Sequence, residues 1–341
     1  MPATTTHDTQ VPGAKHLADG AKHLDHPLRI GASACLLGHE VRFDGGHKRD
    51  QFLLDQLGQY AEMIAVCPEV EVGMGTPRPT LHLERRDGRV HLITTKTACD
   101  QTERMARWAE ARAEALAAED LDGYVLKKDS PSCGLYRVKV YGPGHAGPAV
   151  RDGRGLFAEA LVARLPLLPV EEEGRLNDPR LRENFIERVF AYRRLKGLFR
   201  ARWTMGQLVA FHSAEKLLLL AHEPAAYTEL GRLVAHAKET PREEVVRAYQ
   251  ERFMRALARL ATVRRHVNVL QHMAGYFKKQ LDDAARHHLA QVIDDFGQGL
   301  VPLVVPVTLI DHYARVHHVA YLEGQTYLRP HPKELMLRNH V

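Results

Sequence analysis

One stretch decides the fold, residues 122–134, with the sequence DGYVLKKDSPSCG. Its first half is a short apolar run, typical of a strand that is buried on both faces of a parallel sheet. Its second half gathers two serines, a proline, a cysteine and a glycine, which is the composition of a tight turn. The pattern predicts a thiol, that of Cys133, held just past the end of a buried strand.

Two more cysteines have the same setting. Cys35 follows the apolar run 28–34, and Cys67 follows the apolar run 63–66. Glycine or proline comes within a few residues of each, as it does after Cys133. Because the carboxyl ends of parallel strands meet along one edge of an open α/β sheet, we expect the three thiols to converge there.

Strands and helices alternate through the first half of the chain, which indicates an α/β domain with a mostly parallel sheet and flanking helices. Residues 50–59 and 155–164 have helical spacing, 167–170 reads as a fourth strand, and 138–141 as an edge strand. At 86–89 an Asp-Gly pair separates two alternating runs, which predicts a hairpin.

Beyond Pro179 the strand pattern stops, and apolar residues recur every three to four positions, which predicts an all-α helical bundle. The expected helices are 184–195, 204–221, 225–237, 241–260, 263–281, 283–298 and 306–318. Residues 1–27 are rich in Thr, Gly, His and Lys without apolar periodicity, which favours disorder. The predicted organisation is a disordered tail at 1–27, an α/β domain at 28–175, a helical linker at 176–200 and an all-α domain at 201–341.

The whole chain has the composition of a globular protein of 341 residues, long enough for two domains with their own cores. It has no apolar run of the length that spans a membrane. Its N-terminus lacks the apolar segment of a secretory signal, so we expect a cytoplasmic protein. Four cysteines are too few for a disulfide scaffold, and the cytosol keeps thiols reduced. They are therefore buried fillers, metal ligands or nucleophiles.

The formal charge of +5 is unevenly distributed. Residues 196–341 contain 20 Lys and Arg against 14 Asp and Glu, a net charge of +6, and also 12 of the 21 histidines. A basic C-terminal half beside a near-neutral N-terminal half suggests two modules with different partners, the second attracted to anions.

The three cysteines at strand ends allow several chemistries. A single cysteine is often a small apolar filler. Zinc sites usually contain Cys-x-x-Cys pairs, and the chain has none. Three isolated soft thiolates suit an iron–sulfur cluster, in which a fourth iron without a cysteine would be an open Lewis acid. A further alternative is Cys133 as a metal-free nucleophile beside Ser130.

The residues around these cysteines resemble the thiouracil desulfidase family. The shared motifs are SACLLG at 33–38 with VRFDG at 41–45, CPEV at 67–70 with PRP at 77–79, and SPSCG at 130–134. They occur in the family's order between about residues 28 and 173. The resemblance implies an oxygen-sensitive [4Fe-4S] cluster held by Cys35, Cys67 and Cys133.

The same resemblance implies a catalytic glutamate at Glu69 and a catalytic serine at Ser130. Residue chemistry alone favours ordinary roles, with the glutamate as a carboxylate in the first turn of a helix and the serine as a turn former before proline. Four further residues are assigned to the substrate site, where they contact the substrate or pin the loops around the cluster: Ser33, Arg42, Asp44 and Arg78. Cys99 falls outside the motifs and is expected to be incidental.

The C-terminal half resembles a helical domain family of unassigned function that is often found behind the desulfidase domain. The matching segments are 211–217 and 264–279. Here Arg265, Asn268, His272, Tyr276 and Lys279 follow at helical intervals, which predicts a basic, hydrogen-bonding stripe on one face. Such a stripe could grip RNA phosphates and stack bases, or it could be an ordinary solvated helix face.

The sequence therefore predicts an iron–sulfur-dependent, non-redox desulfidase. Its substrate would be a thiolated pyrimidine, as the free base or a nucleotide, and its products the oxo base and sulfide. Two alternatives stay open, namely an RNA-associated factor with a structural cluster and a metal-free enzyme that uses a cysteine nucleophile.

Overall fold

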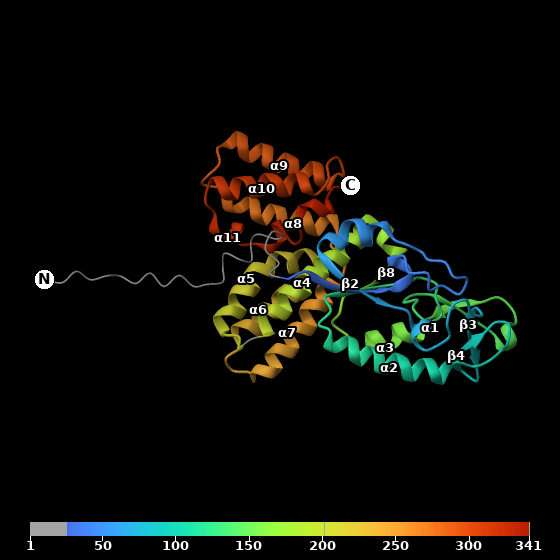
Figure 1. Cartoon of the computed structure of the whole chain (residues 1–341). Helices are drawn as coiled ribbons and strands as arrows, with labels where there is room; N and C mark the ends of the chain where they lie inside the picture. Colours follow the sequence, from blue (N-terminus) through green and yellow to red (C-terminus); the bar gives the residue numbers. More distant parts are fainter. Residues whose placement is uncertain (1–25, 201, 341) are drawn as a thin grey trace. The chain divides into compact units, whose positions relative to one another are not determined.

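The structure is a computed structural model that describes residues 26–200 and 202–340. The tail predicted as disordered, 1–27, lies outside the described residues except for its last two positions. The described residues divide into two compact units, one from 26 to 193 and the other from 194 onward. The division falls within α4 (Pro179–Arg200), a continuous helix that contains most of the predicted linker (Figure 1).

The first unit is built on a parallel sheet with the strand order β2-β1-β5-β8, which confirms the predicted α/β class. Its strands are β1 (Leu28–Ser33), β2 (Ala61–Val66), β5 (Gly123–Leu126) and β8 (Val170–Glu172). Along the chain β1 is followed by β2, which pairs with it on one side, and β5 pairs with β1 on the other side. In open α/β sheets, ligands bind beyond the carboxyl ends of the strands at such a change of direction.

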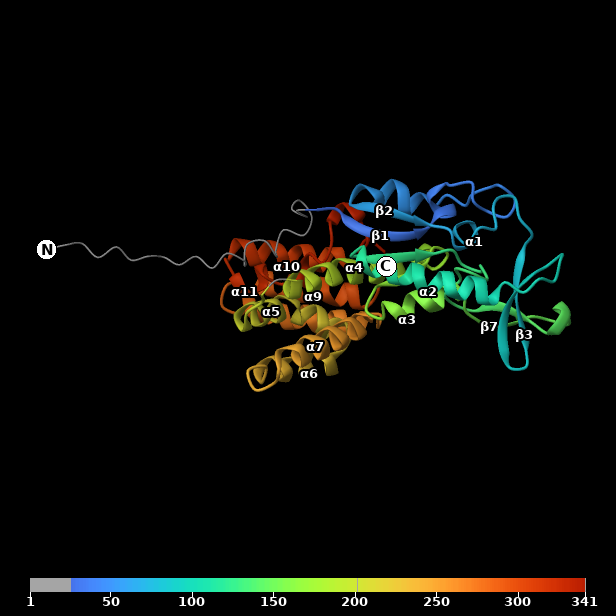
Figure 2. The same cartoon turned by 60° about the horizontal axis from the view of Figure 1, so that its bottom comes forward.

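Helical segments cover both faces of this sheet. On one face, α2 (Thr102–Ala118) and α3 (Leu156–Arg164) lie side by side (Figures 1 and 2). On the other, the segment predicted as a helix at 50–59 forms a π-helical turn, η2 (Phe52–Gln56), and a 3-10 turn, η3 (Leu57–Gln59). The segment is short and contains Gly58, so its helix propensity is low. Its geometry is therefore decided by the burial of its apolar side chains.

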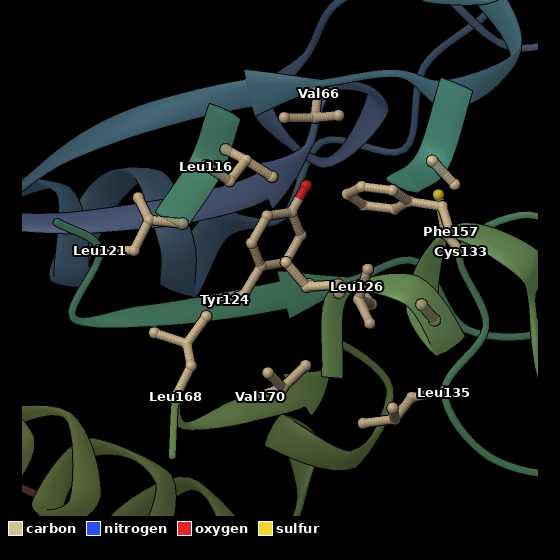
Figure 3. Packing of buried hydrophobic residues seen from close by; sticks show 13 residues of the cluster. Val66, Leu116, Leu121, Tyr124, Leu126, Cys133, Leu135, Phe157, Leu168 and Val170 are labelled. Carbon is tan, nitrogen blue, oxygen red and sulfur yellow. The ribbon is translucent and has the colours of Figure 1, made fainter. Parts of the chain in front are cut away.

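The core between the sheet and α2–α3 reaches the cysteine turn. Tyr124 on β5 stands in its centre and is fully buried, and Cys133 lies at its edge (Figure 3). The ring of Tyr124 meets the ring of Phe157 edge-on, with 5.9 Å between centroids. A Cβ at Gly31 would lie 2.2 Å from the Tyr124 ring, so β1 requires glycine at this position.

A second, mixed sheet with the order β4-β3-β6-β7 lies beyond the first. Its first two strands, β3 (Leu81–Arg86) and β4 (Arg89–Thr94), are the predicted hairpin, with Arg86 opposite Arg89. The segment predicted as an edge strand, β6 (Val138–Tyr141), is instead an inner strand. It pairs in parallel with β3 and antiparallel with β7 (Val150–Gly153), which forms the edge. The sequence pattern did not anticipate this separate sheet, because its β3–β6 pairing joins segments more than 50 residues apart.

The second unit is the predicted helical bundle. Its helices are α5 (Met205–His222), α6 (Pro224–Ala235), α7 (Arg242–Leu257), α8 (Val263–Ala274), α9 (Asp283–Gly297), α10 (Val304–Val316) and the short α11 (Ala320–Glu323). The helix predicted at 263–281 is shorter, because α8 gives way at Gly275 to a 3-10 turn that ends at Phe277. Across both described ranges, no helix combines the length and apolar character needed to cross a membrane.

Candidate active site

The three cysteines that follow β1, β2 and β5 line one cavity of about 380 Å³. Cys35 lies in a 3-10 turn, η1 (Ala34–Leu37), directly after β1. Cys67 immediately precedes α1 (Pro68–Glu71), directly after β2. Cys133 is buried in the turn that follows β5. The structure thus brings together the three thiols that the strand pattern predicted to converge.

The loop between β1 and η2 is fixed against the cysteines at several points. The backbone N–H of Lys48 donates to the carbonyl of Cys35 over 2.8 Å. The sulfur of Cys67 lies 3.8 Å from the carbonyl oxygen of Val41. One wall of the cavity is therefore an ordered loop that both cysteine segments hold in place.

Ser130 organises the turn that carries Cys133. Its hydroxyl oxygen accepts the backbone N–H groups of Ser132, at 3.2 Å, and of Cys133, at 3.1 Å. The N–H of Gly134 donates to the carbonyl of Ser130 over 2.8 Å and closes the turn. Because a hydroxyl has two acceptor sites and one donor, Ser130 retains only its proton for a further partner in the cavity it lines.

Ser33, at the end of β1, is buried and joins two strand ends. Its hydroxyl oxygen accepts the backbone N–H of Lys127 over 2.9 Å. A side-chain hydrogen bond to Cys133 favours the thiolate and counteracts part of the rise in the pKa of that thiol. Ser33 therefore contacts the cysteine turn and the backbone after β5, and it also lines the cavity, so its assignment to the substrate site stays a prediction.

Glu69, on α1, is held by two partners from different loops. One of its oxygens accepts the Nε–H of Arg78 over 2.8 Å, and the other accepts the hydroxyl of Ser132 over 3.0 Å. Ser132 is fully buried, whereas Glu69 is partly exposed and lines the cavity. Sequence reasoning missed Ser132, although it is the second serine of the SPSCG motif.

Arg42 and Asp44 lie together on the loop after β1. The Nε of Arg42 is 3.4 Å from a carboxylate oxygen of Asp44, which also accepts the N–H of Gly46 over 3.1 Å. That backbone hydrogen bond is the main cause of a lowered pKa at Asp44. Arg42 lines the cavity, but Asp44 does not. The geometry of Asp44 fits a turn-forming carboxylate that orients Arg42.

The thiols themselves are hard to ionise in the protein alone. Burial raises the pKa of Cys35 to about 11, helped by neighbouring Cys67 and opposed by Lys127 and Arg42. Burial also raises the pKa of Cys67 and of Cys133. A protonated thiol is a poor nucleophile, whereas a bound metal deprotonates the thiols that coordinate it. Three soft sulfur donors on one cavity fit an iron–sulfur cluster.

Cys99 lies elsewhere. It follows β4 in an exposed turn, where its N–H donates to the hydroxyl of Thr94 over 2.8 Å. It does not line the cavity of the other three cysteines. Its setting matches the expectation of an incidental residue.

The stripe predicted in the C-terminal half is mostly exposed. Asn268, His272, Tyr276 and Lys279 are exposed on α8 and the turn that follows it. Arg265 differs, because it is partly buried and donates to the carbonyl of His222 over 2.6 Å. The opposite face, with Leu270, Met273 and Phe277, is fully buried as predicted.

Residues 30–173 match the family model described as 2-thiouracil desulfurase. Residues 216–332 match a model described as a protein of unknown function (DUF1722). The chain is 34% identical to the uncharacterized protein YbgA of Escherichia coli (strain K12) over 165 residues, 48% of this chain and 98% of YbgA. The chain therefore combines a 2-thiouracil desulfurase domain with a DUF1722 domain.

Among solved structures, the chain is similar to the [4Fe-4S]-dependent thiouracil desulfidase TudS. The identity is 35%, the match covers 44% of this chain and 94% of TudS, and the TM-score is 0.36. All residues that line the cysteine cavity fall inside the segment matched by the desulfurase family. The candidate active site is therefore a property of the desulfurase domain.

Proposed function

We propose that this desulfurase-family protein is an iron–sulfur-dependent, non-redox desulfidase acting on a thiolated pyrimidine. One observation carries the proposal: three cysteines and Glu69 line a single cavity inside the segment that the family matches. The reaction replaces the exocyclic sulfur with the oxygen of water, so the ring carbon gains a C–O bond and loses its C–S bond. The products are the oxo base and sulfide, and no oxidant or reductant is consumed.

Cys35, Cys67 and Cys133 would hold the [4Fe-4S] cluster. When bound, such a cluster supplies a Lewis-acidic iron without a cysteine ligand, suited to a soft thiocarbonyl sulfur. Cys133 is buried at the edge of the apolar core, whereas Cys35 and Cys67 are half-buried in the loops that line the cavity. The reduced cytoplasm, where we propose that the protein works, keeps these thiols free to bind metal.

Glu69 is the proposed proton carrier. It lines the cavity and is held at both oxygens, so it presents a fixed carboxylate to whatever binds there. A carboxylate in that position can take a proton from the attacking water and return it to the ring nitrogen. Ser130, whose hydroxyl proton is its remaining hydrogen-bonding capacity, is the proposed donor to the substrate or the water.

The first test is anaerobic reconstitution with iron and sulfide, followed by an assay of sulfide release. We expect visible thiolate–iron absorbance and sulfide release from 2- or 4-thiouracil, their nucleoside monophosphates or thiolated tRNA. Replacing Cys35, Cys67 or Cys133 with alanine should abolish both signals, while Cys99→Ala should leave both intact. Absorbance that survives Cys35→Ala would contradict the cluster assignment.

Glu69→Gln tests whether Glu69 is needed for the reaction itself rather than for assembly of the cluster. The amide retains the shape of the side chain but cannot take up a proton. We expect the visible absorbance to persist while sulfide release falls about 100-fold or more, the usual contribution of a positioned acid or base. Sulfide release at the rate of the unmodified protein would remove Glu69 from the mechanism.

We also propose that the C-terminal domain contacts RNA. The support is a net charge of +6 over residues 196–341 and the exposed side chains of Tyr276 and Lys279, beside the half-buried Tyr321 and Lys216. The rings of Tyr276 and Tyr321 stack with 4.9 Å between centroids, and the Nζ of Lys216 lies 4.8 Å from the Tyr321 ring. Stacked tyrosines beside cations are a surface on which unpaired bases can stack.

Retention of RNA on filters at increasing salt tests this contact. We expect affinity to fall steeply with salt, and the slope to decrease by about one when Lys279 is replaced by alanine. Lys238→Ala, which replaces an exposed lysine in the turn after α6, is the matched control and should leave the slope unchanged. Salt-independent retention, or equal effects of the two variants, would contradict the proposal.

A further inference from the structure

Phe43 is a large aromatic side chain at the cysteine cavity that folding leaves partly uncovered. Its exposed fraction is 39%, similar to that of Tyr136, at 40%, in the same unit. Phe43 lines the cavity, whereas Tyr136 does not. Each has an arginine near its ring: Arg42 lies 5.4 Å from the Phe43 centroid and Arg175 lies 4.9 Å from that of Tyr136. The two residues thus differ mainly in whether they line the cavity.

The backbone that carries Phe43 is fixed before any ligand arrives. The carbonyl of Phe43 accepts the N–H of Arg78 over 3.0 Å. The N–H of Gly45 donates to the carbonyl of Arg42 over 3.0 Å, and the N–H of Arg42 donates to Gly46 over 3.1 Å. A ring presented by such a closed turn loses little freedom when a ligand binds, which favours affinity.

The surroundings of the ring define what it can bind. Arg42 occupies one side of the ring through a cation–π contact. Phe43 adds a flat aromatic wall to a cavity that is otherwise lined by cations, hydroxyls, thiols and aliphatic residues such as Val66 and Leu81. A planar heteroaromatic ring gains from stacking on such a wall, and an aliphatic or puckered molecule gains less.

We propose that Phe43 is a specificity-determining residue that stacks on the planar ring of the substrate. The inference rests on the proposed desulfidase function and adds a selection rule to it. The site accepts aromatic thiopyrimidines and discriminates against thiocarbonyl compounds that carry the same C=S group on a non-planar ring. The aromatic wall contributes to substrate binding and leaves the cleavage step to Glu69 and the cluster.

The test compares 2-thiouracil with 5,6-dihydro-2-thiouracil, which has the same thiocarbonyl in a saturated ring. With the reconstituted protein, Phe43→Ala should raise KM for 2-thiouracil about 10- to 100-fold, the range of one base–aromatic stack. Its kcat, and its kcat/KM for the dihydro compound, should change little. Phe43→Leu keeps the apolar volume and should show the same loss of discrimination, while Phe43→Trp should retain it.

Tyr136→Ala is the matched control, because it removes an equally exposed ring with an adjacent arginine outside the cavity. We expect it to keep the discrimination of the unmodified protein. Unchanged discrimination in Phe43→Ala and Phe43→Leu, with the usual cluster absorbance, would overturn this inference and leave the desulfidase function standing. Absence of sulfide release by the unmodified protein from every thiopyrimidine would overturn the function and the inference with it.

Discussion

The Nε and Nη2 atoms of Arg78 lie 2.8 and 2.7 Å from the same carboxylate oxygen of Glu69. The remaining N–H groups of Arg78 reach the carbonyls of Val41 and Gly75 and the hydroxyl of Thr76. The five donors of the guanidinium therefore have five contacts within the protein. The side chain of Arg78 is only 4% exposed. It holds Glu69 and two loops in place and has no hydrogen-bond donor left for a substrate.

The first prediction concerns Arg78→Lys. Lysine keeps the charge but cannot reproduce the planar fork that reaches Glu69 and two loops together. We expect a loss of about 2 kcal/mol in the free energy of unfolding, below the 3–5 kcal/mol typical when a buried pair loses one partner entirely. Sulfide release should fall at least about tenfold, because Glu69 is no longer fixed.

Arg49→Lys is the control for Arg78→Lys. Its guanidinium pairs with Asp55 at 3.0 Å, but both side chains are more than half exposed. Exposed pairs contribute about 0–1 kcal/mol, so thermal unfolding and activity should stay near those of the unmodified protein. Equal effects of the two substitutions would show that the buried contacts of Arg78 contribute no more to stability and activity than an exposed ion pair does.

The second prediction concerns the hydroxyl of Ser132. It donates to Glu69 over 3.0 Å from a fully buried position, and hydrogen bonds to charged groups contribute about 1.5–3 kcal/mol. Ser132→Ala should therefore lower kcat about 10- to 100-fold with little change in KM, since Ser132 acts through Glu69 and does not line the cavity. Cluster absorbance should be retained.

A double-mutant cycle distinguishes this positioning role from general damage to the turn. In a Glu69→Gln background the hydroxyl has lost its charged partner, so adding Ser132→Ala should cost little more. Fully additive losses in kcat would show that Ser132 acts independently of Glu69.

Local sequence patterns predicted the features that are determined by residues close together in the chain, namely strands, cysteine turns and a hairpin. Short apolar runs followed by a cysteine predicted three parallel strands with thiols beyond their carboxyl ends, and the cavity contains these thiols. The hairpin at Arg86–Arg89 followed from its Asp-Gly pair. Each of these features is encoded within about ten residues, where turn chemistry and periodicity operate.

Features that depend on distant pairing were not predictable in the same way. Ser132 and Glu69 are 63 positions apart, and their hydrogen bond exists only because β2 and β5 both flank β1. The strand β7, with the sequence VRDG, has no apolar alternation, and its pairing with β6 alone reveals it. Arg78 was predicted at the site, but only the structure shows that all five of its N–H donors already have partners within the protein.

The third prediction concerns Gly155, which immediately precedes α3. A Cβ there would lie 2.5 Å from the carbonyl carbon and oxygen of Ser132 and 2.8 Å from the nitrogen of Cys133. Gly155→Ala should push the cysteine turn out of place, at about 1–3 kcal/mol for an overpacked site. Reconstituted protein should bind less iron and show weaker visible absorbance per chain.

Gly197→Ala is the matched control within α4. No atom lies within 4 Å of the Cβ that it would add, and alanine favours a helix by about 0.5–1 kcal/mol over glycine. This variant should be equally or more stable and load iron normally. Normal iron content in Gly155→Ala would show that the turn tolerates displacement.

The fourth prediction concerns His212, on α5 of the helical unit. Its side chain is 9% exposed, its Nδ1 lies 3.1 Å from the hydroxyl of Tyr249, and Gly231 packs near its Nε2. Burial, with a smaller contribution from the charge of Lys216, lowers the pKa of His212 to about 4 from an ordinary value of 6.5. The folded state therefore keeps a neutral imidazole that the unfolded state protonates more readily.

The sign of the pH effect follows from this difference. Above pH 6.5 both states hold a neutral imidazole, and the full stability is present. As the pH falls from 6.5 towards 4, protonation favours the unfolded chain, and up to about 3 kcal/mol of the free energy of unfolding is lost.

His212→Gln should reduce this part of the pH dependence, because the amide does not titrate. The measurement is urea unfolding followed by the fluorescence of Trp203 in a Trp108→Phe background, which leaves one of the two tryptophans. A variant with the same loss of stability between pH 6.5 and 4 as the unmodified protein would place the titration elsewhere, in the carboxylates of the helical unit.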